Sequence, residues 1–88
     1  MGEVAIGFEI MPDGIEIDLG QLKTQVEGAI NDICRIQSTE ERPVAFGLKA
    51  LHMTVVVEDK EGVMDQLEET IGGIEGVQNA KVASLTKL

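Results

Sequence analysis

Two positions in this chain carry residue types suited to contact with a partner. Phe46 is one of only two phenylalanines in a protein without Trp or Tyr, and Gly47 follows it directly before the longest apolar segment. Lys87 is the next-to-last residue of a chain whose formal net charge is −9. An aromatic side chain at a backbone turn and a cation at the end of an acidic molecule favour a docking surface over an active site.

Each of these two residues also has a simpler interpretation. Phe46 could be a core aromatic at the start of a strand, and Lys87 could be an ordinary solvated lysine. His52 has no second histidine or cysteine at ligand spacing, so we expect it to be a surface residue. Cys34 has no neighbouring base, so we expect it to be a small, semi-buried packing residue and not a nucleophile. The sequence therefore predicts no catalytic residue, no metal site and no cofactor, and we expect that the protein is not an enzyme.

Length and composition limit the class of protein. The 88 residues are 43% hydrophobic and 26% charged, which is ordinary globular usage, so we expect a single domain over residues 1–88. Only seven Lys and Arg residues are present, which argues against direct binding to nucleic acid. A single cysteine, no apolar segment of about twenty residues and no signal-like start predict a cytoplasmic protein without membrane contact.

Hydrophobic periodicity predicts the elements of the first half of the chain. Residues 3–11 alternate between apolar and polar or small side chains, as in a half-buried strand that the turn at Pro12 ends. From Asp18 to residue 34, apolar residues recur every three or four positions, so we expect a helix there. Residues 35–42 are polar and precede a proline, which suggests a short edge strand.

The second half repeats this order. Residues 48–58 form the clearest strand, a second helical stripe runs from Met64 to Ile74, and Val77 to Leu85 is a last strand with a weaker pattern. Two strand–helix–strand halves with right-handed crossovers place both helices on one face of a four-stranded antiparallel sheet. The predicted fold class is therefore α+β, the ferredoxin-like split βαβ sandwich. We expect its other sheet face to be partly open and to carry Ala5, Gly7, Ala50, His52 and Thr54.

Several short segments, in order and over nearly the whole chain, resemble the archaeal elongation factor 1-beta family. They are Met1-Gly2-Glu3-Val4, Pro43 to Leu51, Val55 to Asp59 with Gly62, Leu67-Glu68-Glu69, Ile74 to Val77, and Lys87-Leu88. The resemblance implies a guanine nucleotide exchange factor that binds GDP-loaded elongation factor 1-alpha, weakens its hold on GDP and lets GTP enter. It also implies that Phe46 and Lys87 are the principal contact residues, with Gly47 and Leu88 beside them.

Other functions are open to a small domain with this topology. A regulatory domain that binds a metabolite between two copies of itself is the main alternative. RNA binding is disfavoured because the open sheet face has no aromatic pair, and an acylphosphatase-like activity is disfavoured because no arginine lies in a phosphate-binding loop. Whether Phe46 and Lys87 share one end of the domain depends on the fold.

Overall fold

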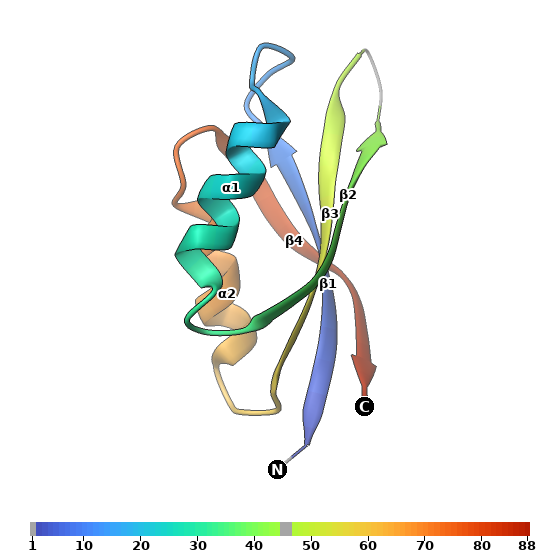
Figure 1. Ribbon diagram of the computed structural model, residues 1–88, viewed down its shortest axis with the longest axis vertical. Coiled ribbons are helices and arrows are strands. Elements are labelled where there is room, and N and C mark those ends of the chain that lie inside the picture. Colours follow the sequence, from blue (N-terminus) through green and yellow to red (C-terminus); the bar gives the residue numbers. More distant parts are fainter. Residues whose placement is uncertain (1, 45–46) are drawn as a thin grey trace.

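The computed structural model describes residues 2–44 and 47–88 and contains four strands and two helices in these ranges (Figure 1). Their order along the chain is the predicted strand, helix, strand, strand, helix, strand. No helix in the described residues has the length and apolarity that a membrane crossing requires. The elements are β1 (Glu3–Pro12), α1 (Leu19–Ile30), β2 (Arg35–Pro43), β3 (Lys49–Glu58), α2 (Val63–Gly72) and β4 (Val77–Lys87).

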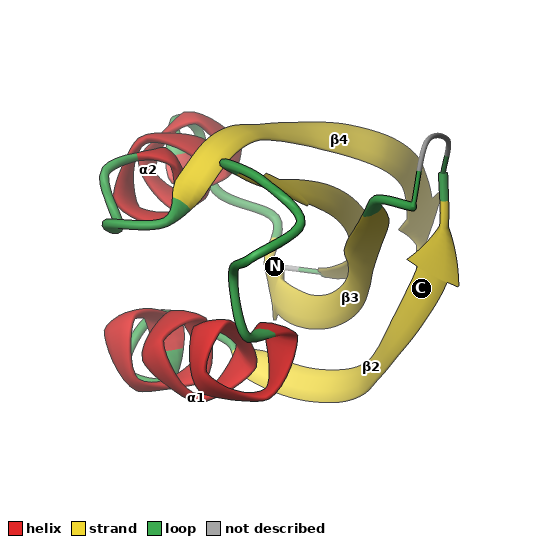
Figure 2. Cartoon of the chain, turned by 90° about the horizontal axis from the view of Figure 1, so that it is seen from above, coloured by secondary structure: helices red, strands yellow, loops and turns green. Residues whose placement is uncertain are grey.

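The four strands form one antiparallel sheet in the order β2-β3-β1-β4. Both helices lie on the same side of this strongly twisted sheet (Figure 2). The ferredoxin-like α+β fold is therefore confirmed. The polar segment after α1 is an edge strand, as predicted, because β2 pairs only with β3.

The core lies between the helices and one face of the sheet. Alternate residues of β1 are buried, and Phe8 at its centre has no exposed surface. The helical stripes supply the opposite side, and about 25 cal/mol is gained for each Å² of apolar surface that this packing removes from water. The core residues are Val4, Ile6, Phe8, Ile10, Leu22, Val26, Ile30, Leu51, Met53, Val55, Val57, Leu67, Ile71 and Val77.

Helix α2 ends at Gly72, two residues before the predicted Ile74, and two further boundaries also differ from the sequence prediction. Helix α1 ends at Ile30 and not at residue 34, because the backbone N–H of Ile33 bonds the carbonyl of Ile30 at 2.9 Å and tightens the chain into a turn. The thiol of Cys34 also donates to that carbonyl, at 3.3 Å, and so helps to close the helix. At the other boundary, β4 continues two residues beyond Leu85 and includes Lys87.

The second sheet face is less open than predicted. Gly7, His52 and Thr54 are partly exposed there, but Ala50 is completely buried. Its methyl group lies directly opposite Arg42 of β2, and a small side chain beside a long one is easily covered.

Candidate partner-binding surfaces

The first candidate surface is the end of the molecule that carries the β2–β3 connection, which we call the hairpin end. Pro43 is paired with Lys49, and the N–H of Val44 bonds the carbonyl of Leu48 at 2.8 Å. Gly47 has φ of +80°, a conformation that side chains disfavour, which gives a physical reason for glycine at this turn. Phe46 lies outside the described residues.

A cleft of about 290 Å³ lies at the hairpin end, between the hairpin and the segment joining β1 to α1. Gly47 and Lys49 line one side, and Ile15 and Asp18 line the other. The Asp18 carboxylate caps α1 by accepting the N–H groups of Gly20 and Gln21, at 2.9 and 3.4 Å. The cleft wall is therefore anchored to the start of a helix.

The second candidate surface, the C-terminal end, contains Lys87. This lysine is directly opposite Val4 in the β1–β4 ladder, and the next N–H, that of Leu88, bonds the carbonyl of Glu3 at 2.9 Å. Because directly opposite residues share a sheet face and Val4 points into the core, Lys87 lies on the helix side of the sheet. It is exposed, and it forms no ion pair with any of the described residues.

A notch of about 200 Å³ adjoins Lys87 on this side. Its apolar lining includes Val4 from β1, Leu85 from β4 and Val63 at the start of α2. The lysine stem therefore runs beside apolar surface while its ammonium can reach solvent, a common arrangement for long cationic side chains.

Two bulges in β4 determine which side chains face the helices. Gln78 and Ala83 have no partner in β1, since the register shifts at both places. After the second bulge, Ser84 lies opposite Gly7, and its hydroxyl fills the space that a side chain at position 7 would need. If Ala83 were paired as an ordinary strand residue, strict alternation from Val82, which faces the helices, would turn Lys87 to the open face.

The two candidate surfaces lie at opposite ends of the sheet (Figure 1). Val57 is the β3 residue level with Val4 and hence with Lys87, whereas Lys49 begins β3 next to the hairpin. At roughly 3.3 Å per residue, Lys49 and Val57 are about 26 Å apart along the strand, and β4 lies about 10 Å further across the sheet. The structure therefore does not bring Gly47 and Lys87 together, and a joint docking model has to be divided into two contacts.

His52 is part of a row of polar and charged side chains on the open sheet face. Its Nε2 atom is 3.5 Å from Oε2 of Glu9, and the other oxygen of Glu9 is 3.2 Å from the ammonium of Lys81. Glu40 of β2 lies opposite His52 and forms an ion pair of 2.9 Å with Arg42. In the described residues no three His, Cys, Asp or Glu side chains are grouped so that they could hold a metal ion.

Cys34 is half-buried at the end of α1. Burial raises the pKa of its thiol above the ordinary value, because desolvation disfavours the thiolate. A protonated thiol is a poor nucleophile, so this side chain suits packing and not covalent chemistry.

Comparison of the sequence with known proteins identifies the family to which this chain belongs. The model of the family described as "EF-1 guanine nucleotide exchange domain" matches residues 5–88. Elongation factor 1-beta of Methanococcoides burtonii is 42% identical over 97% of this chain and 96% of its own length. The homologue of the same name from Methanothermobacter thermautotrophicus is 39% identical over 100% and 99%.

The chain therefore carries an exchange domain of the elongation factor 1 system and is not an enzyme. It belongs to the elongation factor 1-beta family.

A solved structure supports the fold assignment alone. The C-terminal domain of the MgtC protein from Mycobacterium tuberculosis superposes with a TM-score of 0.59, at 10% sequence identity, over 99% of this chain and 88% of that one. At such low identity the likeness reports shared topology and carries no argument about function.

Sequence reasoning missed two side chains of the candidate surfaces. Ile15 and Leu85 are large, apolar and exposed, and each lies beside one candidate surface. Ile15 had a usable signal, since it is an isoleucine between Gly14 and Glu16 in a turn, outside any helical or strand periodicity. Leu85 had none, because its orientation depends on the bulge at Ala83.

Proposed function

We propose that this protein accelerates GDP release from elongation factor 1-alpha through two separate contacts. Phe46 and Gly47 at the hairpin dock on the GTPase, while Lys87, with Leu88 beside it, disturbs the Mg²⁺ and phosphate region. The observation that best supports the role of Lys87 is its position: it is fixed by the β1–β4 ladder, lies beside the apolar notch, and has no ion-pair partner among the described residues.

Thermodynamic linkage explains how such contacts release a nucleotide. A GTPase holds Mg²⁺ and phosphate through switch segments that can become ordered or disordered. An exchange factor that stabilises the distorted arrangement of these segments lowers the affinity of the GTPase for nucleotide. By linkage, bound nucleotide lowers the affinity of the GTPase for the exchange factor by the same ratio. Each tenfold loss of GDP affinity requires about 1.4 kcal/mol of this coupling. A lysine ammonium near the Mg²⁺ site supplies such energy, because it competes with the cation by charge and by volume.

One partner can reach both contacts. A standard interface buries roughly 800 Å² on each side, which corresponds to a circular patch about 32 Å across. The two ends are separated by about 26 Å along the strands. The proposed contacts can therefore belong to a single interface on a partner that extends along the long axis of this molecule, which measures 41 Å.

Stopped-flow release of a fluorescent GDP analogue tests the proposal. Elongation factor 1-alpha loaded with the analogue is mixed with excess GDP, with and without this protein at micromolar concentration. We expect a faster release that saturates with the concentration of the added chain. A release rate that does not change over this range would rule out the exchange function.

A further inference from the structure

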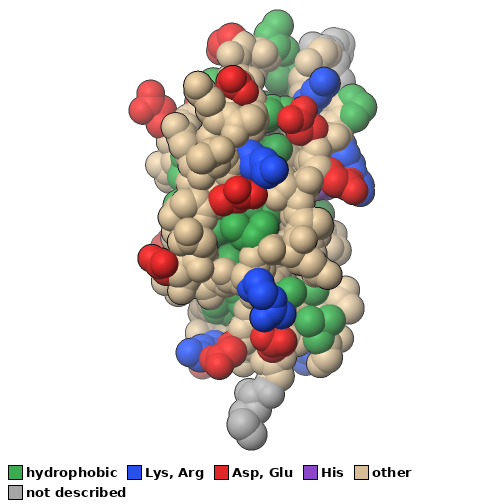
Figure 3. Space-filling view, in the orientation of Figure 1, with side chains coloured by type: hydrophobic (Ala, Val, Ile, Leu, Met, Phe, Trp, Pro, Cys, Tyr) green, Lys and Arg blue, Asp and Glu red, His purple; other side chains and the backbone are tan. Residues whose placement is uncertain are grey.

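Large hydrophobic side chains that remain exposed gather at the two ends of this molecule. In the described ranges 2–44 and 47–88 they are Ile15, Val44, Leu85 and Leu88, with exposed fractions from 48% to 71%. Leu85 and Leu88 adjoin Lys87, and Ile15 and Val44 belong to the hairpin end. Figure 3 shows hydrophobic side chains at the surface at its upper end, close to acidic ones.

Ile15 has the largest exposed fraction of the four, 71%, although its loop is well anchored. The N–H of Asp13 bonds the carbonyl of Gly76 at 2.9 Å, and the N–H of Ile17 bonds the carbonyl of Gly14 at 3.3 Å. Ile17, two residues after Ile15, is partly buried and packs against the core. The loop therefore presents an isoleucine to solvent on a fixed backbone, which lowers the entropy that a partner contact would cost.

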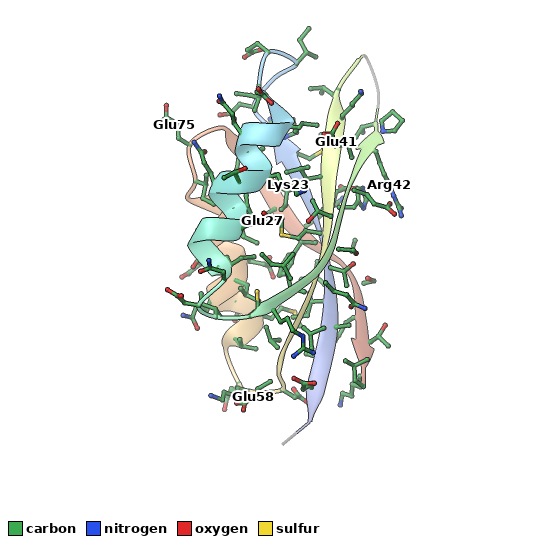
Figure 4. The ribbon with its side chains drawn as sticks, in the orientation of Figure 1. Lys23, Glu27, Glu41, Arg42, Glu58 and Glu75 are labelled. Carbon is green, nitrogen blue, oxygen red and sulfur yellow. The ribbon has the colours of Figure 1, made fainter. Side chains whose placement is uncertain are left out.

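Acidic side chains lie in the same loop as this isoleucine and in the adjoining cleft. Asp13 and Glu16 are exposed in the same loop, and Asp18 and Glu41 line the adjoining cleft, where Lys49 is the one cationic side chain among the described lining residues. Figure 4 shows Glu41 on the helix side of β2, toward α1, and Arg42 on the other side of the strand. An apolar centre with an acidic rim fits a partner surface in which an apolar side chain is flanked by lysine or arginine.

We propose that Ile15 and the cleft beside it bind a segment of the GTPase in which an apolar side chain is flanked by basic residues. This inference rests on the proposed exchange function, and it adds the β1–α1 loop as a second wall of the hairpin contact. The loop increases docking affinity, whereas the C-terminal end acts on the nucleotide. Ile15 therefore affects how tightly the factor binds and not how fast the bound complex releases GDP.

Direct binding and exchange, measured separately, test this inference. Binding of the fluorescently labelled chain to nucleotide-free elongation factor 1-alpha is followed by anisotropy, and GDP release by stopped flow. We expect Ile15→Ser to weaken binding about tenfold, because it removes most of a side chain that the proposed complex would bury, with the release rate at saturation unchanged. Ile15→Val should stay close to the parent. Ala29→Ser, on the exposed side of α1, is the matched surface control.

The outcomes separate this inference from the proposed function. Equal binding by Ile15→Ser and the parent chain would overturn the docking role of the loop, and so would a loss of equal size in the control. A lower release rate at saturation with unchanged binding would also contradict it. If the parent binds without accelerating release, the exchange function fails and the binding comparison still decides the role of Ile15. A parent that neither binds nor accelerates release overturns both.

Discussion

The two ends of this molecule are built in different ways. At the hairpin end, candidate contact residues come from two loops, and the cleft between them has an acidic rim. At the C-terminal end, Lys87 belongs to a strand and is fixed by pairing with Val4 and by the following hydrogen bond to Glu3. A strand fixes where a single charge is placed, whereas loops offer area that a partner can fit. The difference suggests that the C-terminal end sets the rate of GDP release and that the hairpin end sets the affinity for the GTPase.

Loss of the lysine should have the largest effect. Lys87→Ala removes the charge proposed to compete with Mg²⁺, so we expect the release rate at saturation to fall about a hundredfold, equivalent to about 2.7 kcal/mol. Stopped-flow release measured over a range of factor concentrations separates this fall from weaker binding. Lys81→Ala is the matched control, because Lys81 is an exposed lysine of the same strand on the open face. Similar losses in both variants would mean that the net charge of the protein, and not the position of the lysine, determines the release rate.

Loss of the aromatic ring should change the affinity for the GTPase and not the release rate at saturation. Phe46→Ala removes the proposed anchor, and such anchors typically contribute about 2 kcal/mol, so we expect about thirtyfold more factor to be needed for half-saturation. The release rate at saturation should stay near that of the parent. If this rate falls while the half-saturating concentration is unchanged, the proposed division between the two ends is wrong.

An exchange of two neighbouring residues tests whether the sheet face matters. The double variant Thr86→Lys, Lys87→Thr keeps length, composition and charge, but it moves the lysine from the position opposite Val4 to the one opposite Ala5 on the open face. The tail charge remains, so we expect a smaller loss than for Lys87→Ala, about tenfold in the release rate. Parent-like release would show that the ammonium acts from either face.

The smallest effect concerns the hairpin backbone. Gly47→Ala meets no atom of the described residues within 4 Å but forces alanine into φ of +80°, so we expect about 1 kcal/mol lower stability in chemical denaturation. Gly28→Ala is the control, for which we expect a stability change of the opposite sign. Within residues 2–44 and 47–88 it also meets nothing within 4 Å, and because it lies inside α1 it should stabilise the protein by up to about 1 kcal/mol. Equal responses at both sites would contradict the argument from backbone conformation.

The sequence predicted the fold because most of its elements carry a clear period. Strand β1 alternates through Phe8, and α1 repeats Leu22, Val26 and Ile30 on one face. The weak pattern of β4 now has a physical cause, since the bulges at Gln78 and Ala83 reset the alternation twice within one strand.

The candidate site was less predictable, because it depends on pairing between distant segments. The place of Lys87 in the sheet follows from its partner Val4, more than eighty residues earlier in the chain. The prediction had ended the last strand at Leu85, which left the lysine without a defined side of the sheet. The roles of Phe46, Gly47, Lys87 and Leu88 remain predictions.

The bulge at Ala83 also has a consequence for the exposed edge of the sheet. Strand β4 forms one edge of the sheet, and its segment from Val82 to Thr86 is uncharged, so a regular ladder there would offer a template for strands of other molecules. The bulge interrupts that ladder, and Lys81 and Lys87 lie at the two ends of the segment as charged gatekeepers. We therefore expect Lys87 to disfavour strand pairing between molecules, apart from any contact it makes with a GTPase.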